Sequence, residues 1–309
     1  MSSKIQRVLI KRPESAYLNQ SNIDKQADKL NYYGKPIFDQ AVKDYQDFYN
    51  VLKGFDIDIH ELPSNDNTSL DSIYTHDPCI VSNSGVILCS MGKELRKTEP
   101  KEISDYFTSI GIPIVGQISA PGKVEGGDVV WIDERTLAVG VGYRTNMQGI
   151  HQLKQILSND IDEIIPVHLP HWTGSSDCLH LMSNLSPIDR DLYVTYSRLL
   201  PVEFREYLLE RKIDLIEVTD NEYESMGCNV LAVAPREVLM LSGNPITEQS
   251  LIDAGVAVHL YDGSEISIKG AGGPTCLTRP FLREWFWKIV CQLNTKKQYP
   301  QNGILRMNI

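Results

Sequence analysis

The sequence predicts a single α/β domain in which five related units close into a ring. A β-like run, an amphipathic helix and a second β-like run follow one another five times along the chain. Each unit alone would leave an apolar face in water, so the five units are expected to share one core. The chain has 309 residues, of which 42% are hydrophobic, and this is ample for such a core.

The five units are defined by their hydrophobic periodicity. In the first unit, apolar residues recur at the spacing of one buried helix face: Phe38, Val42, Tyr45, Tyr49 and Leu52. The other four units repeat the same order of strand, helix and strand. The predicted elements are 7–11, 38–52 and 57–62; 86–91, 103–110 and 112–115; 136–141, 150–157 and 161–167; 192–196, 204–209 and 213–218; and 238–241, 248–254 and 256–261.

A further strand is predicted before four of the units. The turns that join it to the unit lie at 82–85, 132–135, 188–191 and 234–237. One polar residue precedes each turn by roughly a strand length, and Cys276 opens a segment that could pair with the N-terminal strand and close the ring. Equivalent positions of a pseudo-rotation converge on its axis. A central pocket is therefore expected to contain Asp77, Glu125, His180, Asn229 and Cys276.

Composition narrows the class of function. A formal net charge of −10 disfavours a nucleic-acid partner, because phosphate binding needs a basic face. Residues 1–7 lack the apolar core of a signal peptide, and no stretch reaches the length of a membrane span. We therefore expect a cytoplasmic protein without a membrane partner, and a homodimer is left open. The six cysteines form no CxxC pair, which favours reduced thiols over disulfides or a zinc site.

One cysteine stands in a context that indicates an enzyme. Cys276 directly follows the glycine-rich segment Gly-Gly-Pro-Thr, while Glu125 precedes Gly-Gly-Asp and His180 lies within Leu-His-Leu. A thiol, an imidazole and a carboxylate are the parts of a cysteine nucleophile with its acid/base and an orienting group. An enzyme is therefore the first hypothesis.

Several of these residue types also have a structural interpretation. Asp77, Glu125 and Asp128 could each serve a turn. The segment from Arg96 to Glu99 is interpreted about equally well as an exposed charged loop. His168 and His171 are taken as loop residues. The remaining cysteines are interpreted as small buried residues: Cys79, Cys89, Cys178, Cys228 and Cys291.

Six motifs resemble those of the guanidine-modifying enzymes, whose pentein fold is a five-bladed ββαβ propeller around a central active site. They occur in the order found in that superfamily and cover nearly the whole chain. Within it, the chain is most similar to dimethylarginine dimethylaminohydrolases and next to arginine deiminases. The motifs are Tyr74-Thr75-His76-Asp77-Pro78, Glu125-Gly126-Gly127-Asp128, Arg144-Thr145-Asn146, Leu179-His180-Leu181-Met182-Ser183, Asn229-Val230-Leu231 and Gly272-Gly273-Pro274-Thr275-Cys276.

The resemblance implies a small guanidino substrate and no metal or cofactor. Cys276 would attack the guanidinium carbon as a thiolate. His180 would protonate the departing amine and then activate water against an S-alkylthiouronium intermediate. Glu125 would orient the imidazole, and Asp77 would bind the guanidinium nitrogens. Arg144, with Arg96 as a second candidate, would pair with the α-carboxylate of the substrate.

Met182 bears on the choice of substrate. Arginine deiminases and amidinotransferases generally carry an aspartate two residues after the catalytic histidine, whereas the dimethylarginine enzymes resemble this chain in having a non-acidic residue followed by serine. We therefore expect hydrolysis of N-methylated L-arginine to L-citrulline and methylamine or dimethylamine. Arginine deiminase or amidinotransferase activity is the alternative. The polar segment 17–36 falls where similar enzymes carry a flexible lid.

Two other classes of function are weighed against this one. A zinc hydrolase could use Cys178, His180 and Cys276, because Cys178 and His180 face the same side of an extended segment, although a fourth ligand is missing. A non-enzymatic binding protein is the second class, since ribosome anti-association factors share the pentein fold. Such proteins lack the Cys, His and Glu set that this chain carries.

Overall fold

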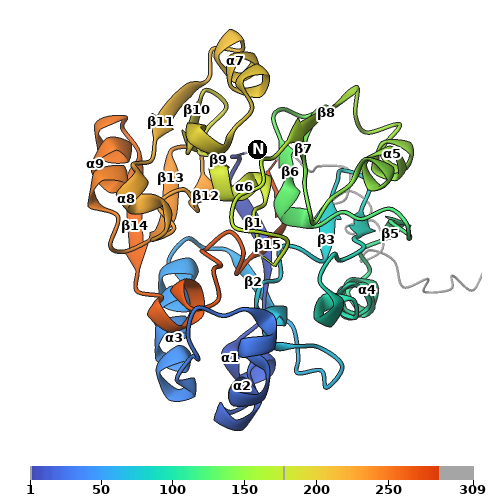
Figure 1. The fold of residues 1–309 in the computed structure, drawn as a ribbon, viewed down its shortest axis with the longest axis vertical. Coiled ribbons are helices and arrows are strands. Elements are labelled where there is room, and N and C mark those ends of the chain that lie inside the picture. The colour runs from blue at the N-terminus through green and yellow to red at the C-terminus, as the bar shows by residue number, and fades with distance from the viewer. Residues whose placement is uncertain (1, 177, 285–309) are drawn as a thin grey trace, which may run out of the picture.

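The computed structural model describes residues 2–176 and 178–284, which form five three-stranded sheets around a common axis (Figure 1). In each sheet the middle strand pairs antiparallel with one neighbour and parallel with the other. The strand orders are β15-β1-β2, β3-β4-β5, β6-β7-β8, β9-β10-β11 and β12-β13-β14. The predicted five-bladed α/β ring is confirmed.

The strands are short, and the ten for which the sequence predicts bounds lie close to them. They are β1 Ile5–Ile10, β2 Asp58–Glu61, β3 Cys79–Val81, β4 Val86–Leu88, β5 Ile114–Gln117, β6 Val129–Trp131, β7 Thr136–Val141, β8 Glu163–His168, β9 Leu185–Pro187, β10 Leu192–Thr195, β11 Asp214–Glu217, β12 Leu231–Ala234, β13 Glu237–Leu241, β14 Ala257–Tyr261 and β15 Arg279–Arg283. The four predicted hairpin turns are confirmed, as is the antiparallel pairing of β15 with β1 that closes the ring.

Five longer helices connect the parallel strands and lie on the outside of the ring (Figure 1). They are α3 Phe38–Lys53, α4 Glu99–Ser109, α5 Met147–Ile156, α7 Val202–Glu210 and α9 Pro245–Asp253; the shorter helices are α1 Pro13–Ala16, α2 Gln20–Gln26, α6 Leu181–Asn184 and α8 Asp220–Tyr223. Helix α4 begins four residues before its predicted start at 103. Its first turn is polar but buried, because Glu99 pairs with Arg96 there; apolar periodicity does not report such a turn.

The apolar core differs from the single core expected from the sequence. Buried hydrophobic side chains form five clusters, and each lies between two neighbouring sheets. In one of them, for example, Leu52 of α3 joins Val8 of β1 and Leu239 of β13. The clusters are separate because polar residues and cavities occupy the ring axis. The axis is therefore available for chemistry, while stability comes from the contacts between blades.

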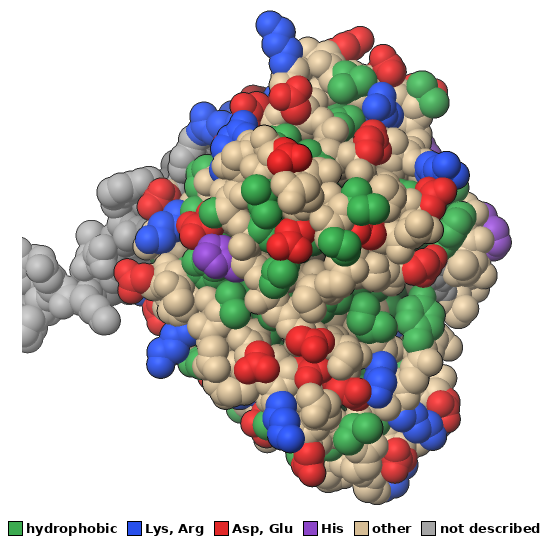
Figure 2. All heavy atoms as spheres, turned by 90° about the vertical axis from the view of Figure 1, so that its left-hand side faces the viewer, with side chains coloured by type: hydrophobic (Ala, Val, Ile, Leu, Met, Phe, Trp, Pro, Cys, Tyr) green, Lys and Arg blue, Asp and Glu red, His purple; other side chains and the backbone are tan. Residues whose placement is uncertain are grey.

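The outer surface is mixed in character. On the face drawn in Figure 2, acidic and basic side chains are interspersed, and hydrophobic side chains are scattered between them. Among the residues that the structure describes, no helix is both long and apolar enough to cross a membrane.

Candidate active site

A cavity of about 230 Å³ opens at the ring axis, at the end where the innermost strands begin. Asp77, His180, Asn229 and Cys276 line it, and Glu125 lies fully buried behind His180. Each of these five residues comes shortly before the first strand of its blade, namely β3, β6, β9, β12 and β15. The structure thus brings together the set of residues that the repeat pattern placed at the axis.

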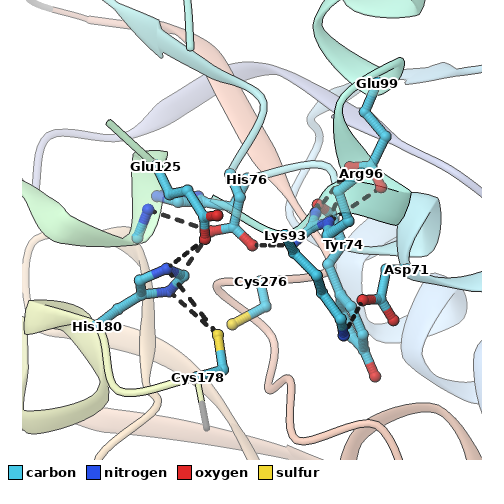
Figure 3. Close-up of polar contacts among 12 residues, drawn as sticks. Asp71, Tyr74, His76, Lys93, Arg96, Glu99, Glu125, Cys178, His180 and Cys276 are labelled. Carbon is cyan, nitrogen blue, oxygen red and sulfur yellow. Dashed lines mark hydrogen bonds and ion pairs between the residues drawn. The ribbon is translucent and has the colours of Figure 1, made fainter. Parts of the chain in front are cut away.

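His180 is held by contacts on both sides of its ring (Figure 3). Its Nε2 atom lies 2.8 Å from Oε2 of Glu125. Its Nδ1 atom lies 3.8 Å from Oδ1 of Asp77 and 3.6 Å from Sγ of Cys178. The backbone N–H of His180 donates to Oγ of Ser183 at 3.1 Å, which closes the first turn of α6. The imidazole is therefore fixed between two buried carboxylates, with Nδ1 on the Asp77 side.

The two glycines after Glu125 make this close packing possible. A Cβ atom on Gly127 would overlap Nδ1 of His180, and one on Gly126 would overlap the carbonyl oxygen of His76. The backbone N–H of Gly127 instead donates to Oδ1 of Asp77 at 3.1 Å. The Gly-Gly pair is thus required by the approach of His180 and Asp77, which is a physical reason for that motif.

Asp128 has the structural role that the sequence suggested for it. Its side chain is buried, and its Oδ1 accepts a hydrogen bond at 3.0 Å from the backbone N–H of Leu181, the residue after His180. Burial raises the pKa of Asp128 to about 6, against the opposing effect of the charged His180. Asp128 therefore ties the segment after Glu125 to the helix that begins at His180.

Asp77 is held by a buried arginine. Nη1 of Arg96 donates to Oδ2 of Asp77 at 2.6 Å. The same guanidinium donates to both carboxylate oxygens of Glu99. Arg96 and Glu99 are only 3% and 1% exposed, so the alternative of an exposed charged loop is wrong for both. Burial opposes the charged form of Asp77, but Arg96 and then His180 outweigh it and lower the pKa of Asp77 well below its ordinary value. Asp77 is thus an anion within the cavity.

Cys276 is half-buried, and its thiol accepts a hydrogen bond from Nδ2 of Asn229 at 3.2 Å. Oδ1 of Asn229 accepts from the backbone N–H of Thr275, so the amide fixes both the turn and the sulfur. A side chain on Gly272 would overlap the ring of Tyr74, which explains the first glycine of the segment that leads to Cys276. Burial and the nearby charge of Asp77 raise the pKa of Cys276 to about 12. This raised pKa favours the thiol over the thiolate near neutral pH.

The pKa of His180 is raised and the pKa of Glu125 is lowered, so both side chains favour their charged forms. Burial disfavours the imidazolium, but Cys178, Asp128 and Asp77 outweigh burial, and the pKa of His180 lies well above its ordinary value. Burial also opposes the charged form of Glu125, yet the hydrogen bond and charge of His180 lower the pKa of Glu125. The pair is therefore an imidazolium beside a carboxylate.

Cys178 departs from its expected structural role. It is half-buried, lines the cavity, and lies within hydrogen-bond distance of His180 (Figure 3). Its spacing of two residues from His180, which puts both side chains on one face, was the signal for this placement. Cys79, Cys89 and Cys228 are buried, as predicted, and Cys291 lies outside the described residues.

The zinc alternative required Cys178, His180 and Cys276 to converge. Within the described part of the chain, a different group of three brings its ligand atoms within 4.8 Å of one another: Asp77, Glu125 and His180. The oxygens of this group already have partners in Arg96, Gly92 and His180. The donor set is therefore not the one that the zinc alternative needs, and its geometry is accounted for without an ion.

Arg144 lies at the edge of the same cavity. It is 5% exposed, and its Nη1 atom lies 3.7 Å from Oε1 of Glu125. The neighbouring Thr145 accepts the backbone N–H of Glu125 at 3.1 Å. His168, at the end of β8, and His171 lie outside this arrangement, and His171 contacts Tyr143 instead.

The segment 17–36 forms one rim of the cavity. Helix α2 and the 3-10 turn Asp28–Leu30 lie in it, and Leu30, Asn31 and Tyr33 face the cavity. Nζ of Lys93 donates to the carbonyl of Leu30 and to Oδ2 of Asp71, both at 2.6 Å. Lys93 could not be predicted, because a single lysine in a polar segment has no pattern. Lys93 thus connects this rim to Asp71.

The comparisons with known proteins agree with this geometry. A family model described as N,N dimethylarginine dimethylhydrolase, eukaryotic, matches residues 12–283. The chain is 29% identical over 252 residues to the N(G),N(G)-dimethylarginine dimethylaminohydrolase of Pseudomonas aeruginosa, covering 81% of this chain and 92% of that protein. It is also 29% identical over 250 residues to an arginine deiminase of Listeria monocytogenes, covering 68% of this chain but only 61% of that enzyme.

Among solved structures, a mutant of the DDAH from Pseudomonas aeruginosa complexed with citrulline has a TM-score of 0.73 and 23% sequence identity. The match covers 90% of this chain and all of that one. At this level of identity the match shows that the fold is shared.

Proposed function

The chain belongs to the N,N dimethylarginine dimethylhydrolase family, and from this premise we propose that it hydrolyses N-methylated L-arginine to L-citrulline and methylamine or dimethylamine. As a member it is a hydrolase acting on the C–N bonds of guanidino compounds. The observation that carries the proposal is the convergence of Cys276, His180 and Asp77 on a single cavity, with Glu125 held against His180.

Binding of the substrate is proposed to begin with Asp77. Asp77 lines the cavity. Its Oδ1 accepts the backbone N–H of Gly127 and lies 3.8 Å from Nδ1 of His180, while its Oδ2 is held by Arg96. A guanidinium placed against this anion would gain charge-assisted hydrogen bonds in a largely desolvated site. We therefore assign guanidinium recognition to Asp77 and assign to Arg96 chiefly the holding of Asp77. The N–H groups of Arg96 already donate to Asp77, Glu99 and the carbonyl of Tyr74.

The nucleophile is proposed to be the thiolate of Cys276. The raised pKa of Cys276 favours the thiol, so a cationic substrate must offset the burial and the charge of Asp77 before attack. The thiol proton passes to solvent, the resulting thiolate forms a bond to the guanidinium carbon, and one C–N bond of the tetrahedral intermediate then breaks. The departing amine takes a proton from His180, whose pKa is raised, and an S-alkylthiouronium group remains on Cys276.

Hydrolysis of this adduct is proposed to reuse the same imidazole. His180, now neutral, takes one proton from a water molecule that attacks the carbon. The C–S bond then breaks, the remaining hydroxyl proton passes to solvent, and the ureido product and the thiolate are released. Glu125 holds Nε2 of His180 throughout. It thereby keeps Nδ1 as the exchangeable position on the side of the cavity.

The choice of a methylated substrate rests on Met182. This residue lines the cavity and follows His180 by two positions, where a second carboxylate would serve an unsubstituted guanidinium. A thioether can pack against N-methyl groups without leaving an unpaired charge. Arginine deiminase or amidinotransferase activity is the competing function, and the arginine deiminase relative is the observation that favours it.

The other end of the substrate is proposed to pair with Arg144 through its α-carboxylate. The segment 17–36 is proposed to act as a lid, because Leu30, Asn31 and Tyr33 face the cavity. Opening would break the contact between Lys93 and the carbonyl of Leu30.

The test is a panel of guanidino compounds assayed for citrulline and for the released amine. We expect methylamine or dimethylamine from methylated arginines at a higher kcat/KM than ammonia from arginine. Arg144→Ala is expected to lower kcat/KM for amino-acid substrates, by an amount equivalent to about 1.5–3 kcal/mol of binding free energy. The same variant should lower kcat/KM for agmatine less. Ammonia from arginine with no reaction of methylated forms would favour the deiminase, and transfer to an added amine would favour the amidinotransferase.

A further inference from the structure

A second cavity, of about 100 Å³, lies behind the active site along the ring axis. It shares His76, Met182 and Thr275 with the active-site cavity, so these residues separate the two. The rest of its wall comes from positions further along the innermost strands of all five sheets. These wall residues are mostly apolar and include Val81, Val129, Pro187, Leu231 and Pro280.

Two arginines of β15 supply the positive charge of this wall. Arg279 and Arg283 are four residues apart on one strand and therefore face the same side. Within residues 2–176 and 178–284, neither forms an ion pair with an aspartate or glutamate. They donate to backbone carbonyls instead: Arg279 to His76, and Arg283 to Ser3 and Ala232. The segment 285–309 contains no aspartate or glutamate in its sequence.

Arg279 is the more deeply engaged of the two. It is 8% exposed, and its Nη2 atom donates to the carbonyl of His76, while its buried Nε atom has no hydrogen-bond partner. Burial lowers the pKa of Arg279. A buried cation with an unused donor is normally compensated by a counter-charge, because leaving it alone is costly.

We propose that the axial cavity binds a small monovalent inorganic anion, of the size and charge of chloride, beside Arg279. One negative charge would offset the guanidinium of Arg279, which is the more deeply buried of the two arginines. The small volume and the apolar side chains around it disfavour larger, strongly hydrated anions such as phosphate. Arg279 lines the cavity, and its guanidinium is the positive charge that the protein offers to the anion.

The site is connected to the catalytic residues through His76. Arg279 holds the carbonyl of His76, and the backbone N–H of His76 donates to the carbonyl of Cys276 at 3.2 Å. His76 also directly precedes Asp77 in the chain. An anion beside Arg279 therefore stabilises the segment that carries the guanidinium-binding carboxylate.

The test uses the full-length protein exchanged into sodium gluconate and titrated with sodium chloride at constant ionic strength. We expect the Tm to rise by about 2 °C at ten times the Kd for chloride. Crystals grown with sodium bromide are expected to show an anomalous peak in the cavity beside Arg279. A wild-type Tm that responds equally to gluconate and chloride, together with bromide bound only on the outer surface, overturns the proposal.

A pair of variants separates this site from general salt effects. Arg279→Met is expected to abolish the chloride dependence of Tm, whereas Arg135→Gln, which removes an exposed arginine paired with Asp162, is expected to keep it. Chloride dependence that persists in folded Arg279→Met rejects the site. If that variant does not fold, the bromide peak in wild-type crystals decides the matter.

Discussion

The Nε2 atom of His180 lies 2.8 Å from Oε2 of Glu125, while the other oxygen of that carboxylate accepts the backbone N–H of Gly92 at 2.8 Å. This contact occupies one ring nitrogen and leaves Nδ1 beside Asp77 and Cys178. Proton transfer to and from the substrate is therefore expected at Nδ1, while Glu125 sets the orientation of the ring. The predictions below depend on this arrangement.

Replacing the imidazole should separate the two chemical steps. His180→Gly is expected to lower turnover by about 10²–10⁴-fold, because both amine protonation and water activation are lost. A thiouronium adduct formed on Cys276 should then persist and be seen by mass spectrometry of the intact protein. Glu125→Gln keeps the size of the side chain but weakens ring orientation and is the comparison. Near-normal turnover in His180→Gly would remove it from the mechanism.

The two thiols of the cavity should differ in role. Cys276→Ser is expected to abolish turnover without a change in Tm, because a hydroxyl is a far weaker nucleophile than a thiolate. Cys178→Ser is the matched control, and it should retain turnover. A haloacetamidine probe is expected to modify Cys276, as peptide mapping would show. Substantial activity in Cys276→Ser, or modification of Cys178 in its place, would argue for a different nucleophile.

The glycine beneath His180 should be intolerant of a side chain. Gly127→Ala places a methyl group against Nδ1 of His180 and Oδ1 of Asp77, so the ring must move. This displacement of the imidazole ring is expected to lower kcat by about 10²-fold. Gly142→Ala is the control, since its Cβ would meet only Leu169 at 3.9 Å. Equal kcat values for the two variants would show that the position of His180 is not critical.

Substrate choice should respond to charge at position 182. Met182→Asp is expected to erode the preference for methylated arginines, because the new carboxylate favours N–H donors and is left unpaired against methyl groups, at a cost of about 1–3 kcal/mol. Met182→Leu keeps an apolar side chain of similar volume and should preserve the preference. The measurement is the ratio of kcat/KM for dimethylarginine and arginine. A ratio that Met182→Asp leaves unchanged would count against contact between this residue and the methyl groups.

The reactivity of the nucleophile should depend on pH in a way that reveals its environment. Burial and Asp77 raise the pKa of Cys276 to about 12, so the thiolate fraction of the empty site increases about tenfold per pH unit throughout the neutral range. Alkylation by neutral iodoacetamide, measured in Cys178→Ser, should accelerate accordingly. A cationic haloacetamidine should react faster at neutral pH and with a shallower pH dependence. A flat iodoacetamide profile between about pH 6 and 9 would mean that the thiolate is already formed.

Much of the fold could be predicted because the units repeat. The helix at 38–52 and the strand at 136–141 agree closely with α3 and β7, since their apolar residues follow a clear period. The arrangement of the apolar core could not be predicted this way. Periodicity shows which face of an element is buried, but not whether five buried faces meet at one centre or in pairs between blades.

The placement of the site residues followed from motif and phase, whereas their partners did not. The sequence offers Arg96 both as a second candidate for the α-carboxylate and as part of an exposed charged loop. In the structure it is buried, and Asp77 and Glu99 neutralise its charge. Cys178 shares a face with His180, but sequence alone does not show that this face meets a cavity. Long-range pairs such as Lys93 with Leu30 leave no local pattern.

Ring closure by β15 also positions the proposed nucleophile. Cys276 lies just before this strand, which pairs with β1 at the other end of the described chain. Contacts between residues so distant in sequence form slowly, because loop closure must precede them. Without this pairing, the chain would carry the imidazole and its carboxylates on other blades but would not have Cys276 positioned beside them. On the proposed mechanism, attack on a guanidino group therefore requires a strand pairing that involves both ends of the ring.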